Sequence, residues 1–117
     1  MSYMLLIIEP SGQRAERSEA EGRALYESMM KFSEELKAQG LLKISQALKS
    51  DSAGVRVEVR NGKRLTHDGP FVETKEIVGG FFLLDCDSRE KAVEIAARCP
   101  AAQWATVEVR ELGPCFM

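Results

Sequence analysis

Residues 77–86 read Ile-Val-Gly-Gly-Phe-Phe-Leu-Leu-Asp-Cys, an apolar run of the length of one β-strand. Successive side chains of a strand point to opposite faces of its sheet. Phe81 and Leu83 therefore share one face, while Phe82 and Leu84 share the other, so both faces of this strand are apolar. A sheet built around such a strand needs a cover on each side, and helices of the same chain can supply one of them.

Two helices are predicted, one on each side of this run in the chain. The first begins with a capping box, in which Ser18 is the N-cap and Glu21 lies three residues on. It carries one apolar stripe at helical spacing and ends at Gly40. The stripe is formed by Leu25, Met29, Phe32 and Leu36. The second helix follows Asp87-Ser88 and ends at Pro100, with Ala92, Val93, Ala96 and Cys99 expected to face inward.

The remaining strands complete an order of strand, helix, strand, a hairpin, then strand, helix, strand. Residues 3–8 are apolar throughout, which is typical of a strand buried on both faces. Val55, Val57 and Val59 alternate with charged residues, which predicts a half-buried strand. Asn61-Gly62 predicts a tight hairpin turn after it. The other strands are expected at residues 42–48, 63–66 and 106–110.

This order predicts an α+β fold, a ferredoxin-like antiparallel sheet with two helices on one face. The other face would expose Phe81 and Leu83, and an apolar face of that size predicts burial by a partner. We therefore expect a homodimer whose two sheets face each other, with a pocket between or beside them. The alternative is that the chain's own residues 49–76 fold back over this face.

The composition restricts the class of protein. A chain of 117 residues is predicted to be one domain, residues 1–117, and its net charge of −2 argues against a nucleic-acid partner. The apolar run at residues 4–8 is too short for a signal peptide or a membrane span. Cys86, Cys99 and Cys115 share no metal-type spacing, and reduced thiols are typical of a cytoplasmic protein.

The densest group of ionisable residues is residues 67–76, His-Asp-Gly-Pro-Phe-Val-Glu-Thr-Lys-Glu, which begin at the only histidine. Asp68 is our first candidate catalytic residue, as a general base or as a group that orients an imidazole. His67 is the second, although in extended chain it points to the opposite face, so the two are not expected to pair within one subunit. A structural alternative stays open, because Asp, Gly and Pro are also the residues that a tight turn uses.

Three further residues are candidate ligand-binding residues. Glu73 and Lys75 lie two positions apart, and either point into a pocket or form a solvated surface pair. Trp104 stacks on an aromatic ligand if it lies in a pocket, and is otherwise a packing residue. Gly79-Gly80 inside a strand indicates a bulge, a close approach of two subunits, or access for a ligand. No cofactor motif is present, and one histidine without clustered thiols argues against a metal site.

The chain resembles the YCII-related family, in the branch named for the tetrapeptide Asp-Gly-Pro-Phe (DGPF). The resemblance is carried by residues 68–71, by Glu73-Thr74-Lys75-Glu76 and by Gly79-Gly80-Phe81. The opening residues 3–7, the Asn61-Gly62 turn and the closing residues 107–110 also look like that branch. The resemblance thus covers nearly the whole chain, and it implies a dimeric α+β barrel.

The resemblance implies two classes of function. Distant YCII-like proteins include lyase-type enzymes that act on aromatic ring compounds, with a His–Asp pair proposed as their active centre. We therefore expect small-molecule binding or acid/base catalysis, of lyase or isomerase type, in a pocket at the dimer interface. The alternative is a non-catalytic regulatory module, because chains of this branch are often associated with extracytoplasmic-type sigma factors.

Overall fold

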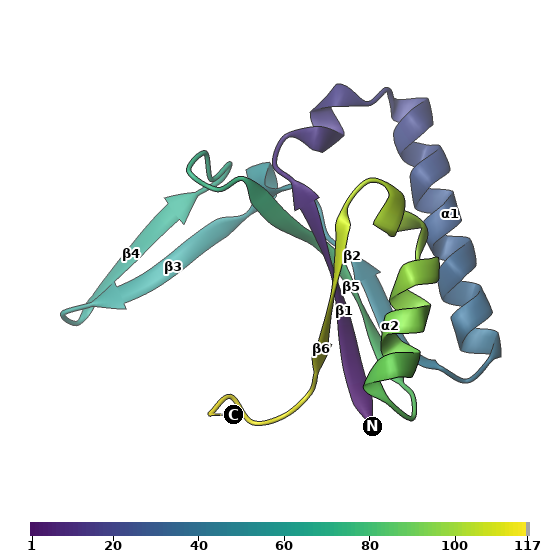
Figure 1. Ribbon diagram of the computed structural model, residues 1–117. Coiled ribbons are helices and arrows are strands. Elements are labelled where there is room, and N and C mark those ends of the chain that lie inside the picture. Colours follow the sequence, from purple (N-terminus) through teal and green to yellow (C-terminus); the bar gives the residue numbers. More distant parts are fainter. Residues whose placement is uncertain (117) are drawn as a thin grey trace.

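The computed structural model describes residues 1–116, which form one four-stranded antiparallel sheet, two helices on one of its faces, and a separate hairpin (Figure 1). The sheet has the order β2-β5-β1-β6, which is the ferredoxin-like arrangement predicted from the sequence. Its strands are β1 (Ser2–Pro10), β2 (Leu42–Ala47), β5 (Glu76–Asp85) and β6 (Thr106–Glu111). The helices are α1 (Glu19–Ala38) and α2 (Arg89–Arg98), and short 3-10 turns lie at η1 (Gln13–Glu16), η2 (Asp51–Ala53) and η3 (Pro100–Gln103).

The helix boundaries follow from local chemistry. The Ser18 hydroxyl accepts a hydrogen bond from the Glu21 backbone N–H (3.1 Å), and the Glu21 carboxylate accepts one from the Ser18 N–H (3.0 Å). This is the predicted capping box, and it satisfies two backbone donors at the start of α1. These bonds to Ser18 lower the pKa of the Glu21 carboxyl, because they favour its charged form. Gly40 ends the helix with a φ of 72°, a conformation that suits glycine.

The core lies between the sheet and the helices. The alternate residues Tyr3, Leu5 and Ile7 of β1 are buried there, together with Phe82 and Leu84 of β5. In α2 the buried residues are Ala92, Ile95 and Ala96. The prediction for Val93 is wrong, because this side chain is 43% exposed while Ile95 is fully buried. The first turn of α2 starts at Arg89, and positions 92, 95 and 96 then share one side of the helix.

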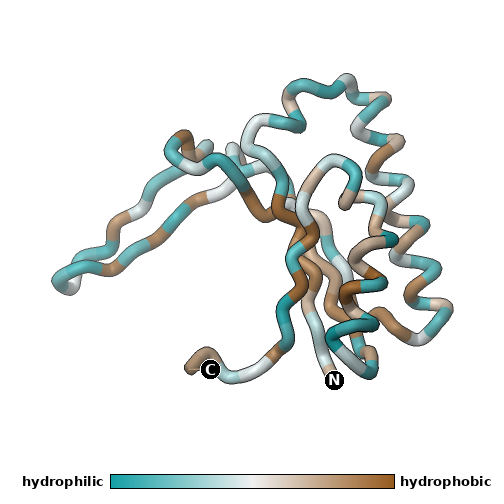
Figure 2. Tube along the Cα trace, in the orientation of Figure 1, coloured by the Kyte–Doolittle hydropathy of each residue, from teal (hydrophilic) through white to brown (hydrophobic). Residues whose placement is uncertain are grey.

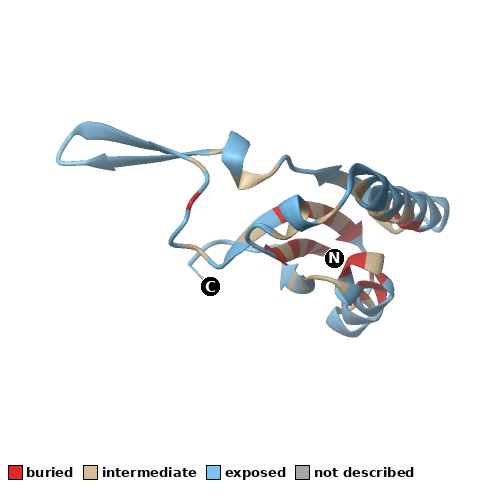
Figure 3. Cartoon of the chain, turned by 90° about the horizontal axis from the view of Figure 1, so that it is seen from above, coloured by how far each residue is buried: buried red, intermediate tan, exposed pale blue. Residues whose placement is uncertain are grey.

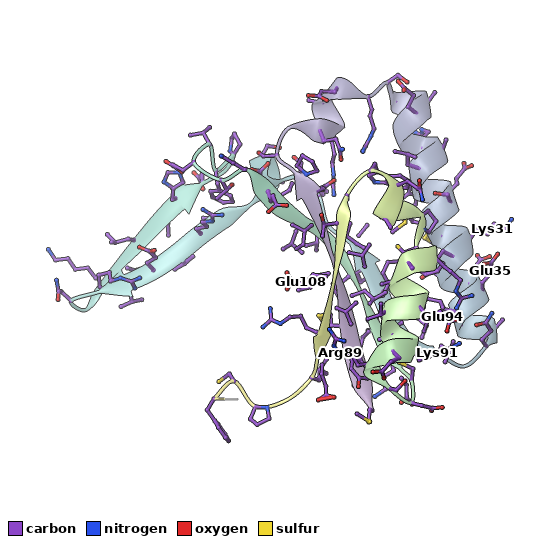
Figure 4. All side chains as sticks on the ribbon, in the orientation of Figure 1. Lys31, Glu35, Arg89, Lys91, Glu94 and Glu108 are labelled. Carbon is purple, nitrogen blue, oxygen red and sulfur yellow. The ribbon has the colours of Figure 1, made fainter. Side chains whose placement is uncertain are left out.

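The other side of the sheet, which we call the open face, carries no helix (Figure 1). The strand register places seven apolar side chains on it: Met4, Leu6, Ile8, Ile44, Val78, Phe81 and Leu83. Ile44 (46%) and Val78 (44%) are exposed, and the other five are half-buried. β1 is therefore not buried on both faces in a single chain. Figure 4 shows Glu108 of β6 pointing to this side, away from the helices, as its pairing with Leu6 requires.

The hairpin is formed by β3 (Val55–Arg60) and β4 (Lys63–Asp68), and we call residues 55–68 the arm. It projects away from the sheet on the side opposite the helices, and every residue of both strands is exposed (Figure 3). The predicted turn is confirmed, with φ of 53° at Asn61 and 75° at Gly62. The half-buried strand predicted at residues 55–59 is wrong for one chain, because nothing in residues 1–116 covers its valines. The alternative in which residues 49–76 cover the open face is wrong for the same reason.

Candidate functional site

A cavity of about 870 Å³ lies between α1 and the helix-facing side of the sheet, at the end of the sheet near η1. Its volume is within the range of small-molecule sites, roughly 300–1,000 Å³. The hydrophobic part of its wall includes Leu25, Met29 and Met30 of α1, Phe82 of β5, and Trp104, which follows η3. The pocket predicted from the sequence lay on the open face, whereas this cavity lies on the opposite side of the sheet.

The polar centre of the cavity is an ion pair between Glu9 and Arg14. Glu9 follows Ile7 on the helix-facing side of β1, and its side chain is 5% exposed. Arg14 belongs to η1, and its Nη2 lies 2.6 Å from Glu9 Oε1. Arg14 also donates hydrogen bonds to two backbone carbonyls, that of Leu48 (2.7 Å) and that of Gly79 (3.3 Å). The guanidinium therefore connects β1 with Gly79 of β5 and with the residue that follows β2.

Glu9 Oε1 lies within the ion pair and has almost no accessible surface. No donor in the described residues makes a well-directed hydrogen bond to Glu9 Oε1, although the Arg14 charge is close to it. Carboxylate oxygens buried in proteins are ordinarily hydrogen-bonded, because removing them from water without a partner is costly. The ion pair with Arg14 supplies that partner, and a hydroxyl or N–H group of a ligand in the cavity would meet the carboxylate beside it. A carboxylate so placed can also accept a proton from that group.

Gly79 makes room for the ion pair. A β-bulge lies at this point of β5, since Ile7 pairs with Gly80 whereas Ile8 pairs with Val78. A Cβ at position 79 would collide with the Glu9 carboxylate and would lie 2.9 Å from Arg14 Nη2. The bulge expected from Gly79-Gly80 is thus present, and its role is to let a carboxylate and a guanidinium approach the backbone.

Trp104 borders the same cavity, as its predicted ligand-binding role requires. The guanidinium carbon of Arg17 lies 6.0 Å from the centre of the indole ring, at the outer limit of a cation–π contact. The Trp104 backbone carbonyl accepts a hydrogen bond from Gln13 Nε2 (2.8 Å), which joins η1 to the segment before β6. The role of Trp104 as a stacking surface stays a prediction.

The catalytic candidates Asp68 and His67 lie outside this cavity. Both belong to β4, which is two residues longer than predicted, and both are exposed. Asp68 pairs with Val55 across the arm and His67 pairs with Arg56, so their side chains point to opposite faces, as expected from an extended chain. A catalytic role for either stays a prediction, and the two do not form a dyad within one chain.

A second, smaller hollow of about 330 Å³ brings His67 together with Glu73. Arg56 and Glu58 of β3 complete its charged wall. Lys75 is exposed and does not line either hollow; its backbone carbonyl accepts a hydrogen bond from Ser11 N–H (2.8 Å). The predicted Glu73–Lys75 site is therefore divided, because Glu73 lines this hollow with His67 while the Lys75 backbone helps to hold the loop before η1.

Most of the Asp-Gly-Pro-Phe motif has a structural role at the base of the arm. Phe71 is 7% exposed, with the Arg56 guanidinium carbon 3.9 Å from its ring centre and the His67 ring 5.9 Å away. The Phe71 N–H donates to Asp51 Oδ2 (3.1 Å), so the carboxylate that caps this turn is Asp51 and not Asp68. A Cβ at Gly69 would collide with the Asp51 backbone carbonyl, which explains the glycine.

The sequence alone did not identify Glu9 or Arg14 as site residues, although the alternation of buried residues in β1 indicated that Glu9 is buried. The alternation of Tyr3, Leu5 and Ile7 on the buried face continues to Glu9, and a carboxylate in that register is a buried charge. Arg14 gave no such signal, because its place depends on the path of η1 over the sheet. Among residues 1–116, no three His, Cys, Asp or Glu side chains are grouped so that they could hold a metal ion.

The fold agrees with the comparisons with known proteins. The sequence profile of the YCII-related domain matches residues 1–115, and the chain belongs to that family. It is similar to 5-chloro-2-hydroxyhydroquinone dehydrochlorinase (TftG) from Burkholderia phenoliruptrix AC1100, solved in complex with 2,5-dihydroxybenzoquinone. That likeness has a TM-score of 0.55 over 97% of this chain and 94% of the other, at 14% identity, and therefore concerns the fold.

A curated relative gives a closer match in sequence over a shorter stretch. The uncharacterized protein R00369 of Rhizobium meliloti (strain 1021) is 43% identical over 54 residues. These residues are 44% of this chain and 44% of the relative, so the match spans less than half of either protein. Over the described residues, neither helix is both long and apolar enough to cross a membrane.

Proposed function

We propose that this protein binds a small, ring-containing organic molecule in the cavity between α1 and the sheet, and acts on it by acid/base chemistry at Glu9. The observation that carries this proposal is a carboxylate that is 95% buried and paired with Arg14 at the wall of a largely apolar cavity. An apolar wall with a few converging polar groups is typical of small-molecule sites.

The roles of the two charged residues follow from their contacts. Arg14 holds the Glu9 carboxylate in place, because it is bound to the backbone carbonyls of Leu48 and Gly79 as well as to the carboxylate. Glu9 accepts the proton of a ligand hydroxyl, and the proton returns to the ligand or passes to its leaving group. A lyase- or isomerase-type reaction fits this arrangement, since it needs a proton moved and no external oxidant. TftG, with the same fold, acts on a hydroxylated ring, which supports the choice of ligand class.

The experiment is isothermal titration with 2,5-dihydroxybenzoquinone as the probe, on the wild type, Glu9→Gln and Asp68→Asn. Glu9→Gln keeps the shape of the side chain and removes its charge, so we expect affinity for the probe to fall at least tenfold. Asp68→Asn lies outside the cavity and serves as the matched control, with affinity unchanged. The opposite result, loss with Asp68→Asn alone, would place the site at the base of the arm, where His67 and Glu73 share a hollow.

We also propose that the protein is a cytoplasmic homodimer whose two copies bury their open faces against each other. Support comes from the seven apolar side chains of the open face, which no part of residues 1–116 covers. Light scattering on a sizing column tests the proposal at micromolar concentration. We expect a dimer for the wild type and for Val93→Glu, an exposed valine on α2, and a monomer for Leu83→Glu. A regulatory module for a protein partner gains support if the wild type is a monomer and binds no ring compound.

A further inference from the structure

The arm is the largest feature that the proposed ligand site does not use. All twelve residues of β3 and β4 are exposed, and three valines stand in a row on one face: Val55 (55% exposed), Val57 (58%) and Val59 (61%). Figure 2 shows these hydrophobic positions alternating with hydrophilic ones along the arm. A two-stranded hairpin with an uncovered apolar row is only marginally stable in water, so this row needs a surface to pack on.

The base of the arm is rigidly built, so its outward direction is a property of the fold. Gly54 O accepts the Gly69 N–H (2.9 Å), and Asp51 Oδ2 accepts the Phe71 N–H (3.1 Å). The buried Phe71 ring lies against the Arg56 guanidinium, which ties the base of β3 to the loop after β4. These contacts hold the arm away from its own sheet and prevent it from covering its own open face.

The overall dimensions point to a missing neighbour. The radius of gyration is 16.0 Å, whereas a compact chain of 117 residues would have about 13 Å. The arm and the open face lie on the same side of the sheet, opposite the helices (Figure 1). Each six-residue strand of the arm reaches about 20 Å, which is longer than the roughly 10 Å that separates two packed sheets. A second copy seated on the open face therefore lies within reach of the arm.

Charge favours the same neighbour. The arm carries four basic residues, Arg56, Arg60, Lys63 and Arg64, and two acidic ones, Glu58 and Asp68, so its net charge is +2. The whole chain has a net charge of −2, and the remainder of the chain therefore carries −4. The positively charged arm of one copy is therefore attracted to the negatively charged remainder of the other copy.

We propose that, in the homodimer, each arm packs the valine face (Val55, Val57 and Val59) against the body of the second copy and so clasps it. This inference rests on the proposed dimer and adds a second contact to the one between the open faces. The opposite face of the arm, which carries Leu65 (49% exposed), remains toward solvent.

The test is the dissociation constant of the full-length dimer, measured by analytical ultracentrifugation for the wild type, Val57→Lys and Leu65→Lys. The two substitutions place the same charged residue on opposite faces of one arm, so they are matched in their effect on the hairpin itself. We expect Val57→Lys to raise the dissociation constant at least tenfold, because a two-fold dimer contains the change twice, and Leu65→Lys to change it less than threefold. Equal dissociation constants for the two variants, whether both raised or both unchanged from the wild type, would overturn the proposal.

Hydrogen exchange gives a second readout that does not depend on a substitution in the arm. In the wild-type dimer we expect the amides of residues 55–60 to exchange at least tenfold more slowly than in the Leu83→Glu monomer. Equal exchange in a dimeric wild type would overturn the clasp while leaving the face-to-face dimer intact. A monomeric wild type would instead remove the dimer, and the clasp with it.

Discussion

Glu9 Oε1 and Arg14 Nη2 lie 2.6 Å apart at the inner end of the α1 cavity, and this pair holds η1 against the sheet. The Glu9 side chain is almost fully buried, while the Arg14 side chain is 35% exposed. A buried charge needs its partner, because the charge left behind after removal of one member cannot return to water. The pair is therefore expected to matter for stability as well as for ligand binding.

The first prediction concerns the removal of the carboxylate charge. Glu9→Gln should lower the free energy of unfolding by about 1–3 kcal/mol, toward the lower end because the Arg14 side chain is partly solvated. Urea unfolding measures the change. Glu94→Gln, which disrupts an exposed pair with Lys91 on α2, is the control and should have little effect. Equal losses for the two variants would mean that the Glu9–Arg14 pair is an ordinary surface contact.

A second prediction concerns the space that Gly79 leaves open. Gly79→Ala should destabilise the protein by about 1–3 kcal/mol, because its Cβ would displace the Glu9 carboxylate. It should also weaken binding of the dihydroxybenzoquinone probe. Gly113→Ala is the control, since a Cβ there meets nothing within 4 Å. Thermal unfolding of the two variants side by side provides the measurement, and a neutral Gly79→Ala would contradict the close approach.

The third prediction separates the two aspartates near the Gly69-Pro70 bend. Asp51→Ala should lower the free energy of unfolding by about 1–2 kcal/mol, because it removes the acceptor for the Phe71 N–H at the base of the arm. Asp68→Ala should change the free energy of unfolding by no more than about 0.5 kcal/mol, as expected for an exposed side chain. Chemical unfolding decides between them. A larger loss for Asp68→Ala would restore the turn role that the sequence suggested for it.

The fourth prediction concerns Tyr3, whose hydroxyl donates to Glu111 Oε1 (3.1 Å). Burial raises the pKa of Tyr3 above its ordinary value of 10.0, and the hydrogen bond and negative charge of Glu111 raise it further. The folded state therefore holds this proton more tightly than the unfolded state does. The resulting stability is complete below pH 10 and is lost as the pH rises through the folded pKa.

Absorbance titration tests this in Tyr26→Phe, which leaves Tyr3 as the only tyrosine. We expect its ionisation above pH 10.0, and a lower value when Glu111→Gln is added. Ionisation at or below the ordinary value would show that the Tyr3 hydroxyl reaches water in the folded protein.

Much of the fold could be predicted from short-range patterns in the sequence. The capping box at Ser18, the stop at Gly40 and the Asn61-Gly62 turn depend on residues within a few positions of each other, and all three are present in the structure. The apolar run at residues 77–86 correctly predicted a strand, because period-2 burial is a local property of extended chain. The ferredoxin-like order followed from the sequence of these elements.

The candidate site could be predicted only in part. Trp104 does border the cavity, but residues 67–76 serve mainly to build the base of the arm, since charged residues gather at turns as well as at active sites. The alternating valines of β3 indicated that one face of this strand packs against another surface. The pattern contains no information on whether that surface belongs to the same chain or to a second one.

The sequence by itself determined the order of the helices and strands, the start and end of α1, and the Asn61-Gly62 turn, because those properties depend on backbone periodicity and nearby hydrogen bonds. Only the tertiary structure decided that Arg14 meets Glu9 beside Gly79, and that Asp51 caps the turn at Phe71. Glu9 and Gly79 lie on paired strands far apart in the sequence. Their approach depends on strand register and on the bulge between Ile7 and Ile8, which are set by packing of the whole sheet.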